Sequence, residues 1–212
     1  MLRRGKIHGV GINDSDYPTR EYDRSSGKRV IVWECPIFVA WKGMMKRCYS
    51  AQYHKKYPTY KGCQVCDEWL SFMNFHKWAK DKIGKDPSGK RLQLDKDFKI
   101  KDNTLYSPET CIFISNTLNN FVSKDERQSS GGYKGVGEKD GKYLVWCKDP
   151  LKRYGSYVGS YKTPKDASDQ FVKRKLEYLE DLKIEGYVPA DLYASVLKMI
   201  EEYSGEYKET AS

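Results

Sequence analysis

The sequence predicts an α+β protein. A strand–loop–strand–helix unit with flanking helices is followed by a three-stranded antiparallel sheet packed by a helix. Apolar residues recur at helical spacing over residues 36–48 and 66–83. Leu92 and Leu94 alternate with polar residues, as in a half-buried strand. Farther along, strand-like runs surround the turn signal Asp140–Gly141, and a helical pattern follows them.

Length and composition limit the class of protein. The chain has 212 residues, a formal net charge of +9 and six cysteines, which is enough for one large domain or two small ones. No apolar run approaches the roughly 20 residues that span a bilayer, and the N-terminus lacks the apolar segment of a secretory signal. Cysteines without a signal indicate a reducing compartment. We therefore expect a cytoplasmic protein with no membrane partner.

The positive charge is concentrated in the centre of the chain. Residues 35–105 contain 15 Lys and Arg against 7 Asp and Glu, interleaved with aromatic residues. Such a segment suits a polyanion, because neutralised phosphates release counterions and aromatic faces stack on bases. The alternative is a solvated basic surface, since charge alone says nothing of the fold.

Four segments are predicted: an N-terminal arm (1–34), a first domain (35–127), a sheet domain (128–184) and a C-terminal amphipathic helix with a polar tail (185–212). The arm is expected to hold one short strand near residues 30–33. Its basic residues would allow it to lie along DNA.

Two helices are predicted at the start of the first domain. The first begins at Pro36, and its apolar face is formed by Ile37, Trp41, Met44 or Met45, and Cys48. A break follows at residues 57–62. The second helix opens at Cys66–Asp67 with Asp67 as its N-cap, and Gly84 is a natural stop.

The cysteines and one histidine of this domain have two interpretations each. Cys63 and Cys66 have the spacing of zinc ligands, and Cys48 and Cys111 would complete a Zn²⁺ site. Free cysteine is, however, also among the most buried residue types. His76 is either a catalytic or metal-binding histidine or a packed side chain on an aromatic helix face.

The stretch from Arg91 to Asn120 carries the densest polar pattern. Asp95–Lys96–Asp97 ends the predicted strand, and residues 101–103 form a turn. Ser107 is expected to cap a new element. Three asparagines, Asn116, Asn119 and Asn120, gather after it.

This stretch resembles the HNH (His-Me finger) endonucleases, and the nearer resemblance is to phage-encoded HNH-like and homing-endonuclease-like proteins. Three segments carry it: GVGINDSDYP at 9–18, WKGMMKRCYS with PTYKGCQVCDEWLSFMNF within 41–75, and LDKDFKIKDNTLYSPETCIF at 94–113. The resemblance implies a strand–loop–strand–helix unit that holds one divalent metal and cleaves DNA. It also implies a location in the cytoplasm of a phage-infected host cell.

The resemblance assigns roles to individual residues. An Asp that binds Mg²⁺ or Mn²⁺ falls on Asp95, and the general-base His falls on Lys96. The central Asn that orients this base falls on Asn103. Asn116, Asn119 and Asn120 compete for the last metal ligand, and Asn119 is favoured.

Lys96 departs from the family pattern. A lysine is normally protonated at neutral pH and cannot accept a proton from water. The neighbouring Asp95 and Asp97 favour its charged form, and an ammonium group repels a metal ion. Either another group, of which His76 is the nearby candidate, serves as base, or the fold is kept for binding.

The sheet domain begins after a short linker at 128–132. Alternation places Tyr143, Val145 and Cys147 on a helix-covered face. The opposite face is expected to present Lys142, Leu144, Trp146 and Lys148 outward, with Lys139, Arg153 and Tyr157 beside them. The alternative for Trp146 is an edge position covered by the first domain. A helix then begins with Thr163 as its cap and Pro164 at its first position.

This domain resembles the DNA-binding domain of plant ethylene-response factors (the APETALA-like type), which phage homing endonucleases often carry. The matching segments are GVGEKDGKYLVWCKD at 135–149 and YVGSYKTPKDASDQF at 157–171. The resemblance implies that the sheet lies in the major groove of double-stranded DNA. Gly137 stands where that family has a base-reading Arg, so the sequence readout is expected to be weaker or different.

The last helix is expected to pack on the sheet domain or on a partner through Leu192, Val196, Ile200 and Tyr203. Three functions follow from the whole sequence. They are a metal-dependent DNA endonuclease, a non-catalytic protein that binds double-stranded DNA, and a protein that binds a host protein through the former DNA surfaces.

Overall fold

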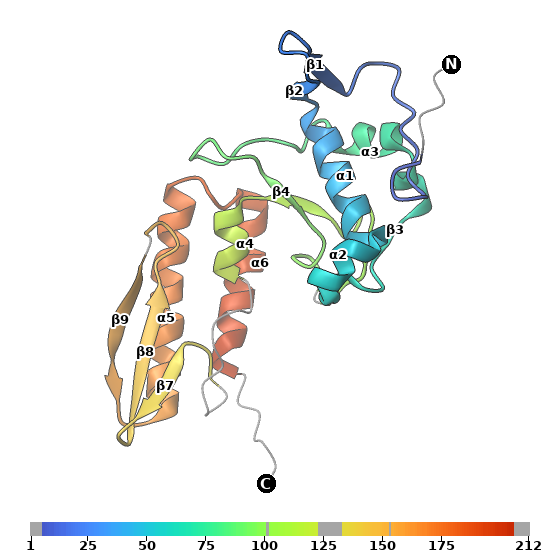
Figure 1. The fold of residues 1–212 in the computed structure, drawn as a ribbon. Helices are drawn as coiled ribbons and strands as arrows, with labels where there is room; N and C mark the ends of the chain where they lie inside the picture. Colours follow the sequence, from blue (N-terminus) through green and yellow to red (C-terminus); the bar gives the residue numbers. More distant parts are fainter. Residues whose placement is uncertain (1–5, 101, 123–132, 153, 206–212) are drawn as a thin grey trace. The chain divides into compact units, whose positions relative to one another are not determined.

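The protein is α+β, and a computed structural model describes residues 6–100, 102–122, 133–152 and 154–205. Contacts divide the chain into two compact units (Figure 1). The first contains residues 1–85 and 91–114, and the second contains residues 86–90 and 115–212. Each unit is described by itself below.

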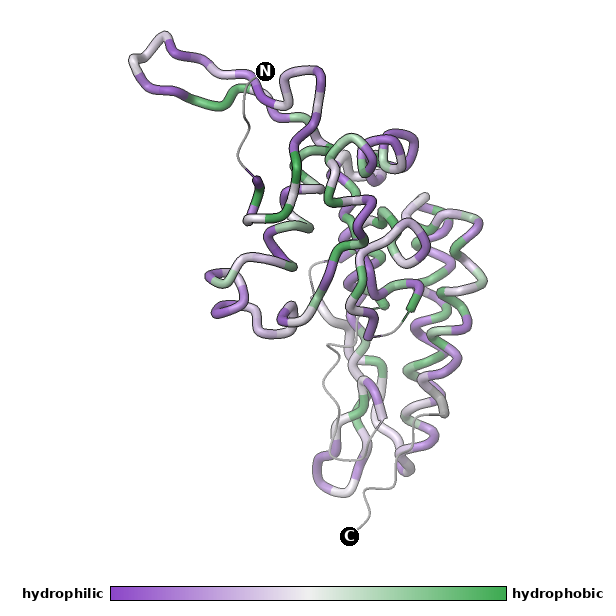
Figure 2. The backbone as a smooth tube through the Cα atoms, turned by 90° about the vertical axis from the view of Figure 1, so that its right-hand side faces the viewer, coloured by the Kyte–Doolittle hydropathy of each residue, from purple (hydrophilic) through white to green (hydrophobic). Residues whose placement is uncertain are grey.

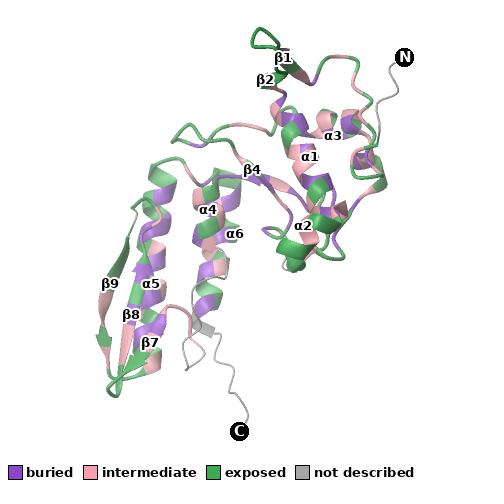
Figure 3. Cartoon of the chain, viewed as in Figure 1, coloured by how far each residue is buried: buried purple, intermediate pink, exposed green. Residues whose placement is uncertain are grey.

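The first unit has a helical core, and its first helix is the predicted one. Helix α1 spans Pro36–Tyr49 and buries Ile37, Trp41, both methionines and Cys48, as the spacing predicts. Short helices follow at α2 (Ala51–Lys56), η1 (Pro58–Tyr60) and η2 (Asp67–Leu70), and then α3 (Phe72–Ala79). Figure 3 shows α2 largely exposed, whereas α1 and α3 turn buried faces to each other.

The predicted cap of the second helix is wrong. Asp67 begins the 3-10 turn η2, and α3 begins only after Ser71, whose hydroxyl accepts from Asn74 N at 3.1 Å. Asp14 supports the same end: its carboxylate accepts from Ser71 Oγ at 2.6 Å and from Met73 N at 2.9 Å. The helix also ends at Ala79, before Gly84, because residues 80–83 turn towards the strand.

Three two-stranded sheets surround these helices. Strand β1 (Arg20–Asp23) pairs antiparallel with β2 (Val30–Glu34), so the arm holds a hairpin rather than one strand. Strand β3 (Gln64–Val65) pairs parallel with β5 (Leu105–Tyr106), and β4 (Gln93–Asp95) pairs antiparallel with β6 (Ile112–Ile114). The hairpin exposes an apolar run on β2, visible in Figure 2. Its base is tied by Glu34, which accepts from Lys42 Nζ at 2.8 Å.

The second unit contains the predicted three-stranded sheet. Strands β7 (Val136–Lys139), β8 (Lys142–Lys148) and β9 (Gly155–Tyr161) are antiparallel in the order β7-β8-β9. The turn Asp140–Gly141 has positive φ at both residues, 52° and 69°, as a two-residue hairpin requires. Helix α5 (Pro164–Ile184) covers one face, and Thr163 Oγ1 accepts from Asp166 N at 3.1 Å.

Helices α4 (Asn116–Val122) and α6 (Ala190–Glu201), with the 3-10 turn η3 (Glu202–Gly205), complete this unit. The new element expected at Ser107 is a turn, and α4 begins after Ser115, whose hydroxyl accepts from Leu118 N at 2.9 Å. Helix α6 buries Leu192, Val196 and Ile200 and contacts α5, which agrees with the predicted stripe.

The division of the chain differs from the predicted segments. The units separate between residues 114 and 115 rather than at 127/128, and the predicted linker 128–132 lies outside the described residues. The C-terminal helix belongs to the second unit because its apolar stripe packs on α5. Across the part of the chain that the structure describes, every helix is too short or too polar to cross a bilayer.

Candidate nucleic-acid interfaces

Asp95, the predicted metal ligand, caps the loop that follows β4. Its Oδ1 atom accepts from Asp97 N at 2.9 Å and from Phe98 N at 2.7 Å. Such a bond from an Asp side chain to the backbone two and three residues on mimics a backbone turn. One oxygen of the half-buried carboxylate is therefore occupied in holding the loop.

Lys96 lies inside the loop rather than on its surface. Its side chain is 9% exposed, and Nζ donates to Asp97 Oδ1 and Oδ2 at 2.7 and 2.8 Å. It also donates to the carbonyl oxygen of Asn103. An ammonium group has three N–H donors and no acceptor. The resemblance places a general base at this position. The structure has an ammonium group there, and its three N–H donors are all engaged.

Asn103 closes the same loop from its other end. Its Nδ2 donates to the carbonyl oxygens of Lys96 at 2.9 Å and Leu105 at 2.6 Å, and its Oδ1 accepts from Leu105 N at 3.1 Å. The structure therefore brings together Asp95, Lys96 and Asn103, as the sequence predicts, but in a network of backbone contacts.

The last predicted ligand, Asn119, lies on α4 in the second unit, together with Asn116 and Asn120. Its pairing with Asp95 around Mg²⁺ or Mn²⁺ stays a prediction. In the first unit, hydrogen bonds and an ion pair already engage part of the carboxylate oxygens near this position. Asp95 has one oxygen engaged, and the adjacent Asp97 carboxylate is neutralised by the Lys96 ammonium group.

His76 and His54 are engaged in ring packing and in a hydrogen bond, respectively. The His76 ring contacts the rings of Tyr17 and Phe72 edge-on, each at a centroid distance of 5.8 Å, which favours the packed interpretation. His54 lies on α2, and its Nε2 is hydrogen-bonded to the carbonyl oxygen of Arg47 at 2.7 Å.

The four cysteines of the zinc interpretation are free thiols in or beside the core. Burial raises the pKa of Cys48 to about 12 and that of Cys111 to about 11, and it raises the pKa of Cys63 and Cys66 as well. Zinc binds the thiolate form, so these surroundings oppose it. In the described ranges, no three His, Cys, Asp or Glu side chains are placed to hold one metal ion.

The outward face of the β7–β9 sheet is the predicted one. Val145 and Cys147 are fully buried, whereas Lys142, Trp146 and Lys148 are exposed. Tyr143 and Leu144 are half-buried on their respective faces. Lys139 at the end of β7 is also exposed, and Arg153 lies outside the described residues.

Trp146 and Tyr157 form an aromatic pair on that face. They are cross-strand partners, their ring centroids are 5.7 Å apart, and their side chains are 48% and 57% exposed. A β-bulge opposite Val145 and Trp146 brings Tyr157 next to the indole. The indole also covers Gly137, where a Cβ atom would lie 3.4 Å from its ring.

The sequence predicts a basic segment rich in aromatic residues, but not which side chains meet in the first unit to form the surface that we call the tyrosine patch. It contains three tyrosines and four lysines of α1, α2 and η1: Tyr53, Tyr57, Tyr60, Lys46, Lys55, Lys56 and Lys61. The sequence does contain a sign of this patch, because the segment from Cys35 to Cys66 has six Lys and Arg and no Asp or Glu.

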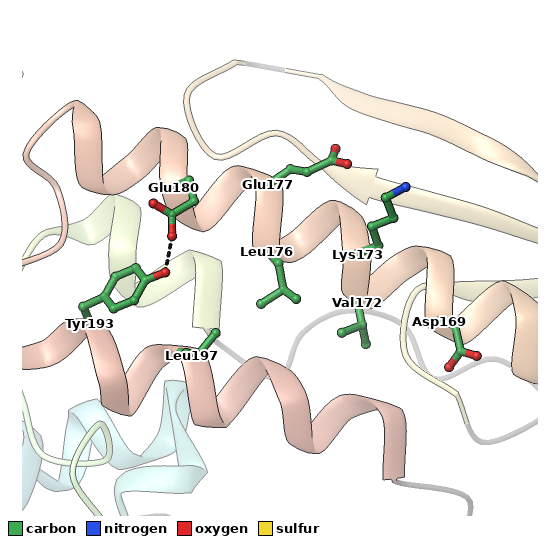
Figure 4. A pocket seen from close by; sticks show the side chains of 8 residues that line it. All are labelled: Asp169, Val172, Lys173, Leu176, Glu177, Glu180, Tyr193 and Leu197. Atoms are coloured by element: carbon green, nitrogen blue, oxygen red, sulfur yellow. Dashed lines mark hydrogen bonds between the residues drawn. The ribbon is translucent and has the colours of Figure 1, made fainter.

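The second unit also has a shallow groove between α5 and α6 (Figure 4). Val172, Leu176 and Leu197 form its floor. Its rim has three carboxylates, Asp169, Glu177 and Glu180, against one cation, Lys173. Tyr193 donates to Glu180 across one end. Each of these carboxylates is also paired with a cation of α5, namely Lys165, Arg174 and Lys183.

We compared the chain with protein-family models, with curated proteins and with solved structures, and none of the three comparisons gave a match.

Proposed function

We propose that this protein binds double-stranded DNA through the outward face of the β7–β9 sheet. The observation that carries the proposal is the exposed pair Trp146 and Tyr157, flanked along the strands by Lys142 and Lys148. Large exposed aromatic residues bordered by polar residues mark interaction sites. Exposed lysines beside them suit phosphates on either side of a groove.

The support beneath this face is rigid. Val145, Cys147 and Phe171 are fully buried between the sheet and α5. The face therefore does not need to become ordered when it binds, which lowers the cost of association. The major groove of B-DNA is wide enough for a β-ribbon.

Trp146 would change how the base edges are read. Its indole lies beside Gly137, the position of the base-reading Arg in the resembling family, where a Cβ atom would be in contact with the ring at 3.4 Å. An indole ring offers one N–H donor and a broad apolar face. The readout would therefore rest on apolar contact, such as with a thymine methyl group, rather than on bidentate bonds to guanine.

The HNH-like loop is assigned a structural role in this proposal. Lys96 uses its ammonium group to tie Asp97 to Asn103 and lacks an acceptor for a proton from water. The loop stabilises the first unit, and hydrolysis by a base at this position is not expected.

A titration of a fluorescent 20-base-pair duplex at several salt concentrations tests the binding. We expect Trp146→Ala to weaken the affinity by about tenfold, and Lys142→Ala with Lys148→Ala to weaken it most at low salt. Lys165→Ala is the matched control, because Lys165 is an exposed lysine of the same unit whose ammonium group is paired with Asp169 at 2.7 Å. Equal losses in the control and the sheet variants, or no binding by the wild type, would reject the proposal.

Metal-dependent nicking of DNA is the second candidate function. The observation that favours it concerns the half-buried carboxylate of Asp95 at the end of β4. Backbone N–H groups of the described residues bond its Oδ1 atom but not its Oδ2 atom. Supercoiled plasmid incubated with Mg²⁺ or Mn²⁺ tests it. Asp95→Asn is the informative variant, because the amide oxygen keeps both backbone bonds while the negative charge is lost. Nicking by the wild type that disappears in Asp95→Asn would establish this function.

A further inference from the structure

We propose that the tyrosine patch of the first unit binds single-stranded nucleic acid. This site is separate from the sheet face of the second unit and does not depend on the duplex binding proposed for it. The two features that carry the inference are closely packed, partly exposed tyrosine rings and a segment, Cys35 to Cys66, that contains lysines and no acidic residue.

The rings pack into one aromatic platform whose neighbouring members are tilted by 37° and 55°. The centroid of Tyr53 is 4.6 Å from that of Tyr57 and 5.7 Å from that of Tyr60. Tyr57 is 39% exposed and lies at the junction of α2 and η1. Every nucleobase has a flat face, so a row of rings can accept successive unpaired bases without reading their sequence. Bases in a duplex are already stacked and do not offer these faces.

Cations surround the platform. Lys46 Nζ lies 5.2 Å from the centroid of the Tyr53 ring, and Lys56 Nζ lies 5.3 Å from that of Tyr57. Lys55 and Lys61 are exposed beside them. No carboxylate occurs in the sequence between Glu34 and Asp67, so the α2 and η1 segments contribute positive charge only. A backbone of phosphates that follows the rings would meet these lysines.

The patch continues into the loop that resembles the nuclease motif. Burial raises the pKa of Tyr60. The positive charges of Arg47 and Lys96 oppose this rise and the Asp97 carboxylate adds to it, so all three groups lie within electrostatic reach of the Tyr60 hydroxyl. Arg47 is held in place by a bond from Nε to Tyr106 Oη at 2.9 Å. A strand on Tyr57 and Tyr60 would therefore lead towards Arg47, whose planar guanidinium group suits phosphate.

Short helices and exposed side chains make the patch easy to alter without unfolding the chain. Helix α2 has no buried residue, and Lys55, Lys56 and Tyr57 are all exposed. We therefore choose Tyr57→Ala and the double variant Lys55→Glu with Lys56→Glu. Tyr57→Phe keeps the ring and removes only the hydroxyl group. Tyr154→Ala removes an exposed tyrosine of the second unit, 79% exposed, and is the matched control.

The experiment measures fluorescence anisotropy of labelled 12-nucleotide oligo(dT), oligo(rU) and a 12-base-pair duplex with the full chain. We expect Tyr57→Ala to weaken oligo(dT) binding about tenfold, which is the usual effect of losing one stacked base. Tyr57→Phe and Tyr154→Ala should bind like the wild type. The charge-reversal variant should weaken binding to both oligonucleotides and reduce its dependence on salt.

Different outcomes separate this inference from the proposed function. Loss of duplex binding in Trp146→Ala, with oligo(dT) binding retained, supports two independent sites. Wild-type affinity for oligo(dT) in Tyr57→Ala would overturn the inference even if duplex binding is confirmed. Competition by polyglutamate as strong as that by oligo(dT) would also overturn it, because the patch would then be a general surface for acidic polymers. A preference for oligo(rU) over oligo(dT) would assign the site to RNA.

Discussion

The ammonium group of Lys96 donates to both carboxylate oxygens of the adjacent Asp97, at 2.7 and 2.8 Å, in the loop between β4 and β5. A third bond reaches the carbonyl oxygen of Asn103, whose own amide returns to Lys96 O. Lys96 and Asn103, to which the resemblance assigns catalytic roles, are therefore hydrogen-bonded to each other. The physical role of this pair is to fix the loop, and the first predictions follow from it.

Lys96→Ala should destabilise the first unit by about 1–3 kcal/mol, because the partly buried carbonyl oxygen of Asn103 loses a charged donor. The Asp97 side chain is half exposed and can be rehydrated, so its share of the loss is small. Urea unfolding followed by circular dichroism measures the change. Lys99→Ala is the control: Lys99 is exposed, and its loss should change the stability by less than about 0.5 kcal/mol. Equal stabilities of the Lys96 variant and the wild type would contradict the structural role.

The two substitutions of Asp95 should differ in stability. Asp95→Asn keeps an oxygen that accepts from Asp97 N and Phe98 N, and its stability should remain close to that of the wild type. Asp95→Ala removes this acceptor and should cost about 1–2 kcal/mol, as the loss of a capping side chain does. Thermal unfolding of the two variants side by side makes the comparison. The idea of a cap fails if both variants lose the same stability.

Much of this fold is visible in the sequence because the packing obeys simple periods. The face of α1, the Asp140–Gly141 turn and the alternation along β8 all follow from spacing. The sheet face of the candidate site was predictable for the same reason. A strand that buries Val145 and Cys147 must expose Trp146.

Other features depend on contacts between distant segments, which spacing does not reveal. Lys175 is fully buried on α5 because Nζ donates to the carbonyl oxygen of Phe121 at 2.9 Å, 54 residues away in the chain. Helix α2 is only six residues long and amphipathic patterns need more turns. The side chains that meet in the tyrosine patch were not predicted, because its rings meet through the α2–η1 turn rather than through a regular period.

Gly135 combines two constraints, and Gly135→Ala should be severely destabilising. Its φ is +68°, and a Cβ atom there would lie 2.2 Å from the Phe171 ring, which is fully buried under the sheet. Backbone strain and overpacking together should cost roughly 2–5 kcal/mol. Gly141→Ala separates the two causes, because Gly141 has φ +69° and open space around its Cβ position. It should lose only about 1–2 kcal/mol. Thermal unfolding of both variants tests the order, and equal losses would refute the steric argument.

Salt dependence should distinguish the lysines of the sheet face from its aromatic pair. The slope of log affinity against log salt concentration counts the phosphates that a protein neutralises. Lys142→Ala and Lys148→Ala should each reduce this slope by about 1. Trp146→Ala should weaken duplex binding at every salt concentration and leave the slope unchanged, because the indole carries no charge. A lower slope in Trp146→Ala would show that the ring acts by placing a lysine.

The buried thiols should make the first unit sensitive to alkali. Burial raises the pKa of Cys48 from 9.0 to about 12, that of Cys111 from 9.0 to about 11, and that of Tyr17 from 10.0 to about 12. Above pH 9 the unfolded chain releases these protons while the folded chain retains them. Their contribution to stability is therefore complete below about pH 9 and decreases as the pH rises towards 11–12.

Melting temperatures measured between pH 7 and pH 11 should accordingly fall steeply above pH 9. Cys48→Ala removes one of these groups and should have a flatter profile, although it melts lower at pH 7 because Cys48 is packed in the core. The difference between the wild type and this variant should thus narrow as the pH rises. Parallel profiles would mean that Cys48 keeps an ordinary pKa. In that case burial would not oppose deprotonation of its thiol, and the argument against a zinc site at Cys48 would lose its basis.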